Sequence, residues 1–136
     1  MNYLLDVNVL VAWGWADHAD HKRVVRWIAS TKSSTSDSLV TSSIPELGFV
    51  RVSLQRAAGR LTVEDAVKTL QSMIGSLGGS HAFLPDDQSS TMGFANWCAG
   101  ASRTTDAHLL ALAARHGAEL ATLDLGIPGA FVIPSV

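Results

Sequence analysis

The stretch MNYLLDVNVLVAW (residues 1–13) decides the fold class, because its hydrophobic pattern changes at a single acidic residue. Residues 2–5 form a short apolar run that is typical of a buried strand, and from Asn8 onward the apolar side chains recur at helical spacing. Asp6 lies at the junction, where Asn8 is better placed to cap the helix. An ionised carboxylate that is taken out of water is costly unless it is paired or bound to a cation. Asp6 is therefore a candidate functional residue at the end of a strand.

The rest of the chain repeats this order of strand and helix. Further strands are expected at LVTS (39–42), HAFLP (81–85), ELATL (119–123) and FVIP (131–134), and helices at residues 21–30, 43–57, 63–77, 88–99 and 104–117. Short apolar strands that alternate with helices predict a parallel sheet covered by helices on both faces. We therefore expect an α/β fold in which residues 1–136 form a single domain around a sheet of four to five strands.

Composition and charge exclude several classes of protein. Hydrophobic residues make up 47% of the 136 residues and charged residues 16%, which indicates a globular chain and not a disordered one. The only cysteine, Cys98, excludes an internal disulfide and suits a reducing compartment. No signal peptide and no membrane-spanning stretch is expected, so we predict a cytoplasmic protein. The net charge of −2 gives no strongly basic surface that would indicate a nucleic-acid partner.

Four acidic residues are expected to gather at one edge of this sheet. Asp6 and Asp124 directly follow predicted strands, whereas Glu46 and Asp106 lie in the first turns of predicted helices. The carboxyl ends of parallel strands meet at one edge, and ligands of open α/β sheets bind beyond that edge. The four carboxylates are therefore expected to share one crevice.

Each acid also has a purely structural explanation. Glu46 could complete a capping box with Ser43, Asp106 could interact favourably with a helix dipole, and Asp124 could form a turn. One shared cause explains their common position better than separate structural causes. Carboxylates in one crevice repel one another unless a cation offsets them, and Mg²⁺ or Mn²⁺ prefers oxygen ligands. Such ions can activate a water for phosphodiester hydrolysis, whereas zinc would need His or Cys at these strand ends.

Three segments carry a resemblance to a known family. LLDVNVLVAW, SSIPELGFVR and TTDAHLLALAARHGAELATLD, with FLPDD between the last two, resemble the PIN-domain ribonucleases, specifically the VapC-like toxins of bacterial and archaeal toxin–antitoxin pairs. The resemblance implies a PIN-like three-layer α/β/α fold with strand order 3-2-1-4-5. It further implies a metal-dependent endoribonuclease that forms a homodimer. A cognate VapB-like antitoxin would insert its C-terminal segment into the acidic groove.

The resemblance also implies roles for individual residues. The catalytic acids would be Asp6, Glu46, Asp106 and Asp124. Of these, Asp6, Asp106 and Asp124 would be the main ligands of Mg²⁺ or Mn²⁺, and Glu46 would be a further ligand or would orient the attacking water. Asn8 and Thr122 would support the first and last of these acids through hydrogen bonds.

Two positions, one with a basic residue and one without, are relevant to RNA binding. Arg51 lies one to two turns after Glu46, where it could contact a phosphate or pair with an acid. Relatives often carry a basic residue directly after the last acid, whereas this chain has Leu125. This departure leaves open a second interpretation, a PIN-fold module that binds RNA or antitoxin with weak or no catalysis.

Two other phosphate-handling classes fit the sequence poorly. A receiver-type phosphoacceptor domain needs paired acids after the first strand and a late lysine, but no lysine follows Lys68. A haloacid-dehalogenase-like phosphatase needs a second aspartate where Asn8 stands. The sequence does not identify the RNA target, and it does not distinguish one metal ion from two.

Overall fold

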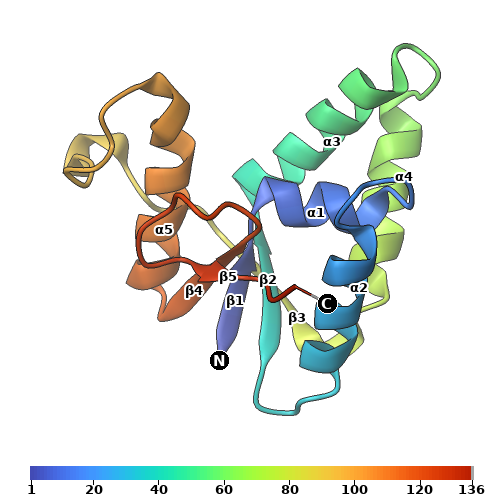
Figure 1. Cartoon of the computed structure of the whole chain (residues 1–136), viewed down its shortest axis with the longest axis horizontal. Coiled ribbons are helices and arrows are strands. Elements are labelled where there is room, and N and C mark those ends of the chain that lie inside the picture. The colour runs from blue at the N-terminus through green and yellow to red at the C-terminus, as the bar shows by residue number, and fades with distance from the viewer. Residues whose placement is uncertain (136) are drawn as a thin grey trace.

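A five-stranded parallel sheet forms the centre of the structure, a computed structural model that describes residues 1–135. The strands are β1 (Asn2–Leu5), β2 (Ser38–Ser42), β3 (His81–Leu84), β4 (Ala118–Thr122) and β5 (Phe131–Val132). They lie in the order β3-β2-β1-β4-β5, and every neighbouring pair is parallel (Figure 1). This arrangement confirms the parallel α/β sheet and the strand order that the resemblance implied. It also brings the carboxyl ends of β1 and β4 side by side at the centre of the sheet.

Helices cover both faces of the sheet. The structure contains α1 (Val7–Gly14), α2 (His21–Lys32), α3 (Ser43–Ala57), α4 (Val63–Gly75) and α5 (Thr104–Arg115). Figure 1 shows α5 on one side of the sheet and the other four helices on the opposite side. The three-layer α/β/α architecture is therefore confirmed.

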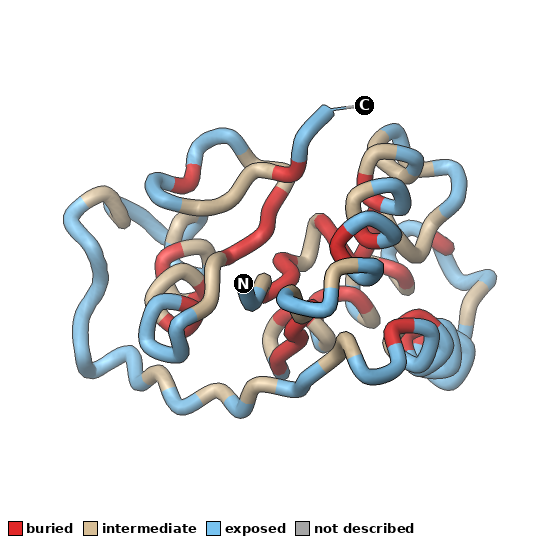
Figure 2. The backbone as a smooth tube through the Cα atoms, turned by 90° about the horizontal axis from the view of Figure 1, so that it is seen from below, coloured by how far each residue is buried: buried red, intermediate tan, exposed pale blue. Residues whose placement is uncertain are grey.

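Neighbouring residues of the strands supply two separate cores. Leu4 and Leu5 are fully buried, yet Leu4 packs with Leu109 and Leu112 of α5, whereas Leu5 packs in the cluster that contains Phe49 of α3. Side chains alternate between the two faces of a strand, so a strand covered on both sides must be apolar throughout. Figure 2 shows the buried residues concentrated at the centre, with exposed loops around them.

The junction between β1 and α1 differs from the prediction by two residues. Asp6, and not Asn8, is the N-cap of α1, because Asp6 Oδ1 accepts a hydrogen bond of 2.8 Å from the Val7 N–H. The Asp6 N–H bonds to the Ala121 carbonyl and so extends the pairing of β1 with β4 up to the cap. Asn8 consequently lies inside the helix, and its side-chain amide is available for contacts with other segments.

The helix predicted over residues 88–99 is absent. This segment contains one 3₁₀ turn, Ser90–Met92, and is otherwise irregular and mostly exposed. A helix of this length needs an apolar face packed against the protein, but Phe94 is 44% exposed and Met92 60%. Helix α5 begins as predicted at Thr104, and Arg103 occupies the N-cap position without a side-chain cap bond.

The other helix boundaries follow the sequence more closely. Thr62 caps α4 through a capping box with Asp65, and Gly117 has the positive φ of +68° expected of a residue that ends a helix. Within residues 1–135, no helix combines the length and the apolar character that crossing a bilayer requires.

Candidate active site

Asp6 is the most deeply buried of the predicted acids. It follows β1 directly, and its side chain is held by two hydrogen bonds, from the Val7 N–H to Oδ1 at 2.8 Å and from the Thr122 hydroxyl to Oδ2 at 2.8 Å. Burial raises the pKa of this carboxyl, and the carboxylates of Asp106 and Asp124 raise it further, whereas the two hydrogen bonds lower it. Asp6 is thus a buried acid that faces two other acids.

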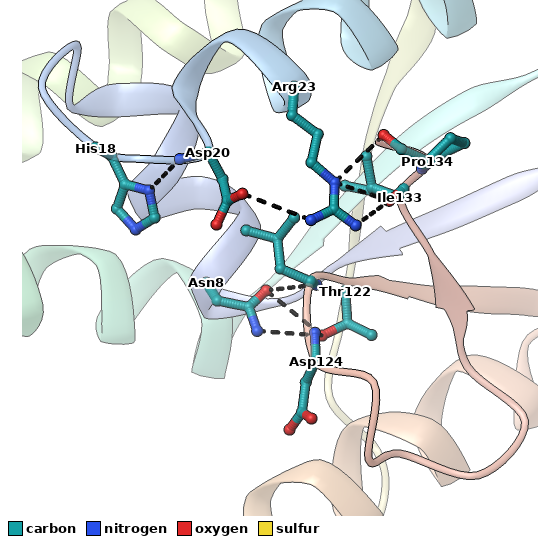
Figure 3. Close-up of polar contacts among 9 residues, drawn as sticks. Asn8, His18, Asp20, Arg23, Thr122, Asp124, Ile133 and Pro134 are labelled. Atoms are coloured by element: carbon teal, nitrogen blue, oxygen red, sulfur yellow. Dashed lines mark hydrogen bonds and ion pairs between the residues drawn. The ribbon is translucent and has the colours of Figure 1, made fainter. Parts of the chain in front are cut away.

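Thr122 at the end of β4 joins three site residues through one hydroxyl group. The hydroxyl has one proton to donate, and the contact with Asp6 at 2.8 Å is shorter than the alternative contact with Asn8 Oδ1 at 3.4 Å. The Thr122 oxygen in turn accepts from the Asn8 amide and from the Asp124 N–H, each at 3.1 Å (Figure 3). Asn8 Oδ1 also accepts from the Leu123 N–H at 3.1 Å. These bonds fix α1 against the end of β4.

Asp106 and Asp124 complete the acidic group. Asp106 lies in the first turn of α5, where burial raises the pKa of its carboxyl, the Asp124 carboxylate raises it further, and Arg103 lowers it. Asp124 Oδ1 accepts from the Gly126 N–H at 2.7 Å. Figure 3 shows the Asp124 carboxylate pointing away from the contacts of Asn8 and Thr122. The carboxylates of Asp106 and Asp124 therefore lie close enough to Asp6, and that of Asp124 close enough to Asp106, to raise the pKa of these two carboxyls.

Glu46 lies in the first turn of α3, but its carboxylate contacts a different neighbour. Glu46 Oε2 accepts from the Thr41 hydroxyl at 2.7 Å, and Thr41 Oγ1 lies 2.7 Å from His81 Nε2. Because the hydroxyl proton goes to Glu46, His81 donates to Thr41. The capping box that Glu46 could form with Ser43 is absent, since Ser42 occupies the N-cap position without a side-chain cap bond. The structure thus separates the contacts of Glu46 from those of the three aspartates.

A cleft opens in front of Asp6 and Asp106. It has a volume of about 460 Å³, and its lining also includes Asn8, Arg51 and Arg56. Arg51 is exposed and forms no ion pair within the described chain, whereas Arg56 pairs with Asp17 at 3.1 Å. Arg51 therefore lines the same cleft as Asp6 and Asp106 without pairing with either acid. The cleft combines carboxylates with guanidinium groups, an arrangement that suits a ligand with anionic groups and a bound cation.

The donor atoms fit a hard divalent cation. Asp6, Asp106 and Asp124 offer carboxylate oxygens, and none of the three forms an ion pair with another residue among residues 1–135. Their uncompensated charge suits Mg²⁺ or Mn²⁺. Within this same range, no three His, Cys, Asp or Glu side chains lie together in an arrangement that could hold a metal ion by themselves. Mg²⁺ commonly takes one or two carboxylates and completes its shell with waters and substrate phosphates.

Three residues of the site region were not predicted from the sequence to contribute to the site. Thr41 is a strand residue like its neighbours, His81 begins β3, and Arg103 ends the short 3₁₀ turn Ala101–Arg103. Thr41 contacts Glu46 across the junction of β2 and α3, whereas His81 reaches Thr41 because β2 and β3 pair. Arg103 precedes Asp106 by three residues, and this i,i+3 spacing near a helix start is the only sequence pattern that relates it to the site.

Comparison with known proteins adds an independent line of evidence. Residues 3–129 match the family model described as the PIN domain. The chain is 39% identical to "Ribonuclease VapC39" of Mycobacterium tuberculosis, over 93% of this chain and 91% of the relative. It is 37% identical to "Ribonuclease VapC38" of the same organism, over 91% and 86%, and 32% identical to "Ribonuclease VapC29", over 93% and 89%. The similarity thus extends through every segment that supplies a site residue.

Proposed function

Because the chain belongs to the PIN-domain family and is similar to VapC ribonucleases along most of its length, we propose that it is a metal-dependent endoribonuclease toxin. Its reaction is the hydrolysis of RNA phosphodiester bonds. The observation that supports this activity best is the influence of the Asp106 and Asp124 carboxylates on Asp6, and of Asp124 on Asp106, since each raises the neighbouring pKa although the residues come from separate segments. Such a group of carboxylates is unfavourable unless it binds a cation.

Asp6, Asp106 and Asp124 would hold Mg²⁺ or Mn²⁺. The bound ion would lower the pKa of a water molecule and offset the negative charge of the reacting phosphate. The structural support is the donor set, which consists of carboxylate oxygens alone, and the raised pKa of the Asp6 and Asp106 carboxyls.

The other residues of the site position these acids and the substrate. Thr122 holds Asp6 in one orientation, and Asn8 fixes Thr122 and the start of the loop that carries Asp124. Arg51 supplies a positive charge in the cleft that would attract the RNA backbone. Glu46, held by Thr41, would orient the attacking water or act as a further ligand after its side chain turns.

The relationship to VapC proteins also supports the expected partners. A cognate VapB-like antitoxin would cover the acidic cleft, and the active form would be a homodimer in the cytoplasm, where its RNA substrate is found. Residues 1–136 would act as one catalytic domain.

RNA cleavage by the purified protein tests this proposal. Cellular RNA is incubated with the protein and Mg²⁺ or Mn²⁺, and the wild type is compared with Asp6→Asn and with Glu64→Gln. Glu64 is an exposed acid on α4 whose side chain is 77% accessible, so its substitution controls for the general loss of a charge. We expect Asp6→Asn to lower the rate by at least about 100-fold, which is typical for loss of one group that stabilises transition-state charge.

EDTA should abolish cleavage by the wild type, and Glu64→Gln should retain it. Activity that persists both in EDTA and in Asp6→Asn would contradict the proposed reaction. RNA binding without any cleavage would instead favour the alternative of a binding module.

A further inference from the structure

Arg103 is a cation beside the acidic group that pairs with none of its members. Its guanidinium lies over the Trp97 ring, with Cζ 5.0 Å from the ring centroid, and Nη2 donates to the Gly126 carbonyl. Nε is buried without a hydrogen-bond partner, and Nη1 makes no hydrogen bond within residues 1–135. The guanidinium is thus held on one face and at one edge, and Nη1 still has protons to donate.

The neighbours of Gly126 show where Nη1 lies. A Cβ atom added to Gly126 would lie 3.2 Å from Asp124 Oδ1 and 3.4 Å from Arg103 Nη1. Arg103 also occupies the N-cap position of α5, three residues before Asp106 in the first turn of that helix. Arg103 therefore stands at the corner of the site formed by Asp106 and Asp124, although it forms no ion pair with either of them within the described chain.

A guanidinium held in this way suits a phosphate group. The planar fork of arginine matches the geometry of phosphate oxygens, and stacking on an aromatic ring keeps the fork in place before the ligand arrives. We propose that Arg103 binds a backbone phosphate of the RNA at the Asp124 corner of the site. This inference rests on the proposed ribonuclease function and adds to it a residue that positions the substrate.

The residue after the last acid, Leu125, leaves Arg103 to supply the positive charge on this side of the site. Leu125 is 85% exposed and contributes no charge, so the residue after the last acid cannot contact phosphate electrostatically. Arg103 is bonded to the carbonyl of Gly126, the next residue along. The positive charge beside Asp124 is therefore supplied from the 3₁₀ turn Ala101–Arg103 that directly precedes α5.

A purely structural role for Arg103 makes a different prediction. If Arg103 only anchors the loop at Gly126, its replacement changes stability and leaves the salt dependence of RNA binding unchanged. If Arg103 contacts a phosphate, RNA binding releases the counterion of that phosphate. Replacement of Arg103 should then reduce the number of counterions released and make binding less sensitive to salt. The slope of log affinity against log salt distinguishes the two roles.

The test measures binding of a short, fluorescein-labelled, single-stranded RNA of mixed sequence by anisotropy. Ca²⁺, which also takes oxygen ligands, replaces Mg²⁺, and the salt concentration is raised from about 50 mM to about 200 mM. We expect Arg103→Met to weaken binding about tenfold, as for the loss of one charge-assisted hydrogen bond. The salt slope should fall by about 0.7, the value for one phosphate contact on a single strand. The control is Arg26→Met, an exposed arginine on α2, which should change neither quantity.

Two further variants separate charge from folding. Arg103→Lys keeps the charge and should retain most of the salt slope. Arg103→Met combined with Leu125→Lys places a charge on a neighbouring exposed position and should restore the slope. Thermal unfolding of each variant, followed by circular dichroism, identifies any loss of structure.

An unchanged affinity and slope in a folded Arg103→Met protein would overturn the assignment of Arg103 alone, because the wild type would still bind RNA. A wild-type protein that neither binds nor cleaves RNA would overturn both this inference and the proposed function.

Discussion

Thr122 shows how much of the site depends on a single hydroxyl group. It donates to Asp6 and accepts from the Asn8 amide and the Asp124 N–H, so it uses its proton and both lone pairs. Thr122 is completely buried, and no water is needed to satisfy it. The orientation of Asp6 is therefore set by the protein before any ligand binds.

Replacement of Thr122 by valine should weaken metal binding. The substitution keeps the shape of the side chain and removes the bond to Asp6, and loss of such an outer contact typically lowers metal affinity about 10- to 100-fold. The measurement is the Mg²⁺ concentration that gives half-maximal RNA cleavage. Thr122→Ser retains the hydroxyl and serves as the control. An equal Mg²⁺ requirement in the valine variant and the wild type would show that Thr122 does not orient the ligand.

At the level of elements, α1 and α3 pack closely because α3 carries a glycine at their contact. A Cβ atom on Gly48 would lie 2.6 Å from Val7 Cγ2. Val7 begins α1 directly after Asp6, and Gly48 follows Glu46 by two residues. The close approach of these two helices therefore sets the spacing between the segments that carry two of the predicted catalytic acids.

Gly48→Ala should destabilise the protein by about 1–3 kcal/mol, as is usual when extra volume is forced into a packed contact. Gly75→Ala is the matched control, since Gly75 is also helical and a Cβ there would meet no atom within 4 Å. That change should be neutral or slightly stabilising because alanine favours the helix. Urea unfolding measures both free energies. Equal stabilities for the two variants would contradict the described contact of α1 with α3.

The pairing of β2 with β3 makes a prediction about pH. Burial lowers the pKa of His81 below 6.5, and Glu46 opposes this effect only in part. A lowered pKa means that the folded protein holds the proton less tightly than the unfolded chain. The stability due to neutral His81 is therefore fully present above about pH 6.5 and is lost as the pH falls through the lowered pKa.

The wild type should accordingly lose more of its free energy of unfolding than His81→Gln when the pH falls from about 7.5 to about 5.5. Glutamine does not titrate, and its amide is able to donate to Thr41. Urea unfolding at both pH values checks this difference. Parallel pH profiles for the two proteins would show that His81 does not titrate differently in the folded state.

At the level of the whole molecule, the site exists only where distant parts of the chain meet. Asp6 follows β1, Asp124 follows β4, and Asp106 lies on the helix that leads into β4. On the side of β4 away from β1, Arg23 of α2 donates to the carbonyls of Ile133 and Pro134, which directly follow β5 (Figure 3). These bonds hold the end of β5 against α2. Any ligand that bridges these acids should consequently stabilise the entire fold.

Mg²⁺ should therefore raise the thermal midpoint of the wild type. At an ion concentration about a hundredfold above the dissociation constant, linkage gives about 2.7 kcal/mol. Asp106→Asn should lose most of this gain. In EDTA the same variant should be at least as stable as the wild type at neutral pH, because the raised pKa of Asp106 shows that folding disfavours its ionised form. Equal Mg²⁺ stabilisation of both proteins, with NaCl as the ionic-strength control, would exclude Asp106 as a ligand.

The sequence by itself determined the layers of the fold and identified the candidate acids. Buried parallel strands must be apolar on both faces, and helices must show an apolar stripe, so both patterns are local and visible in stretches such as residues 1–13. The positions of Asp6, Asp106 and Asp124 at strand ends or helix starts follow from the same patterns, whereas the order of the strands in the sheet came from the resemblance to the PIN family. The helix predicted over residues 88–99 was wrong because helical spacing alone does not show whether a face will be buried.

Only the tertiary structure decided the contacts among side chains. His81 reaches Thr41 through strand pairing, Thr122 joins Asp6 to Asn8, and Arg103 donates to the carbonyl of Gly126. These contacts depend on distances between residues far apart in the chain, and a one-dimensional pattern contains no such distances. For the same reason, Asp6 and not Asn8 caps α1, because the pairing of β1 with β4 continues to the Asp6 N–H.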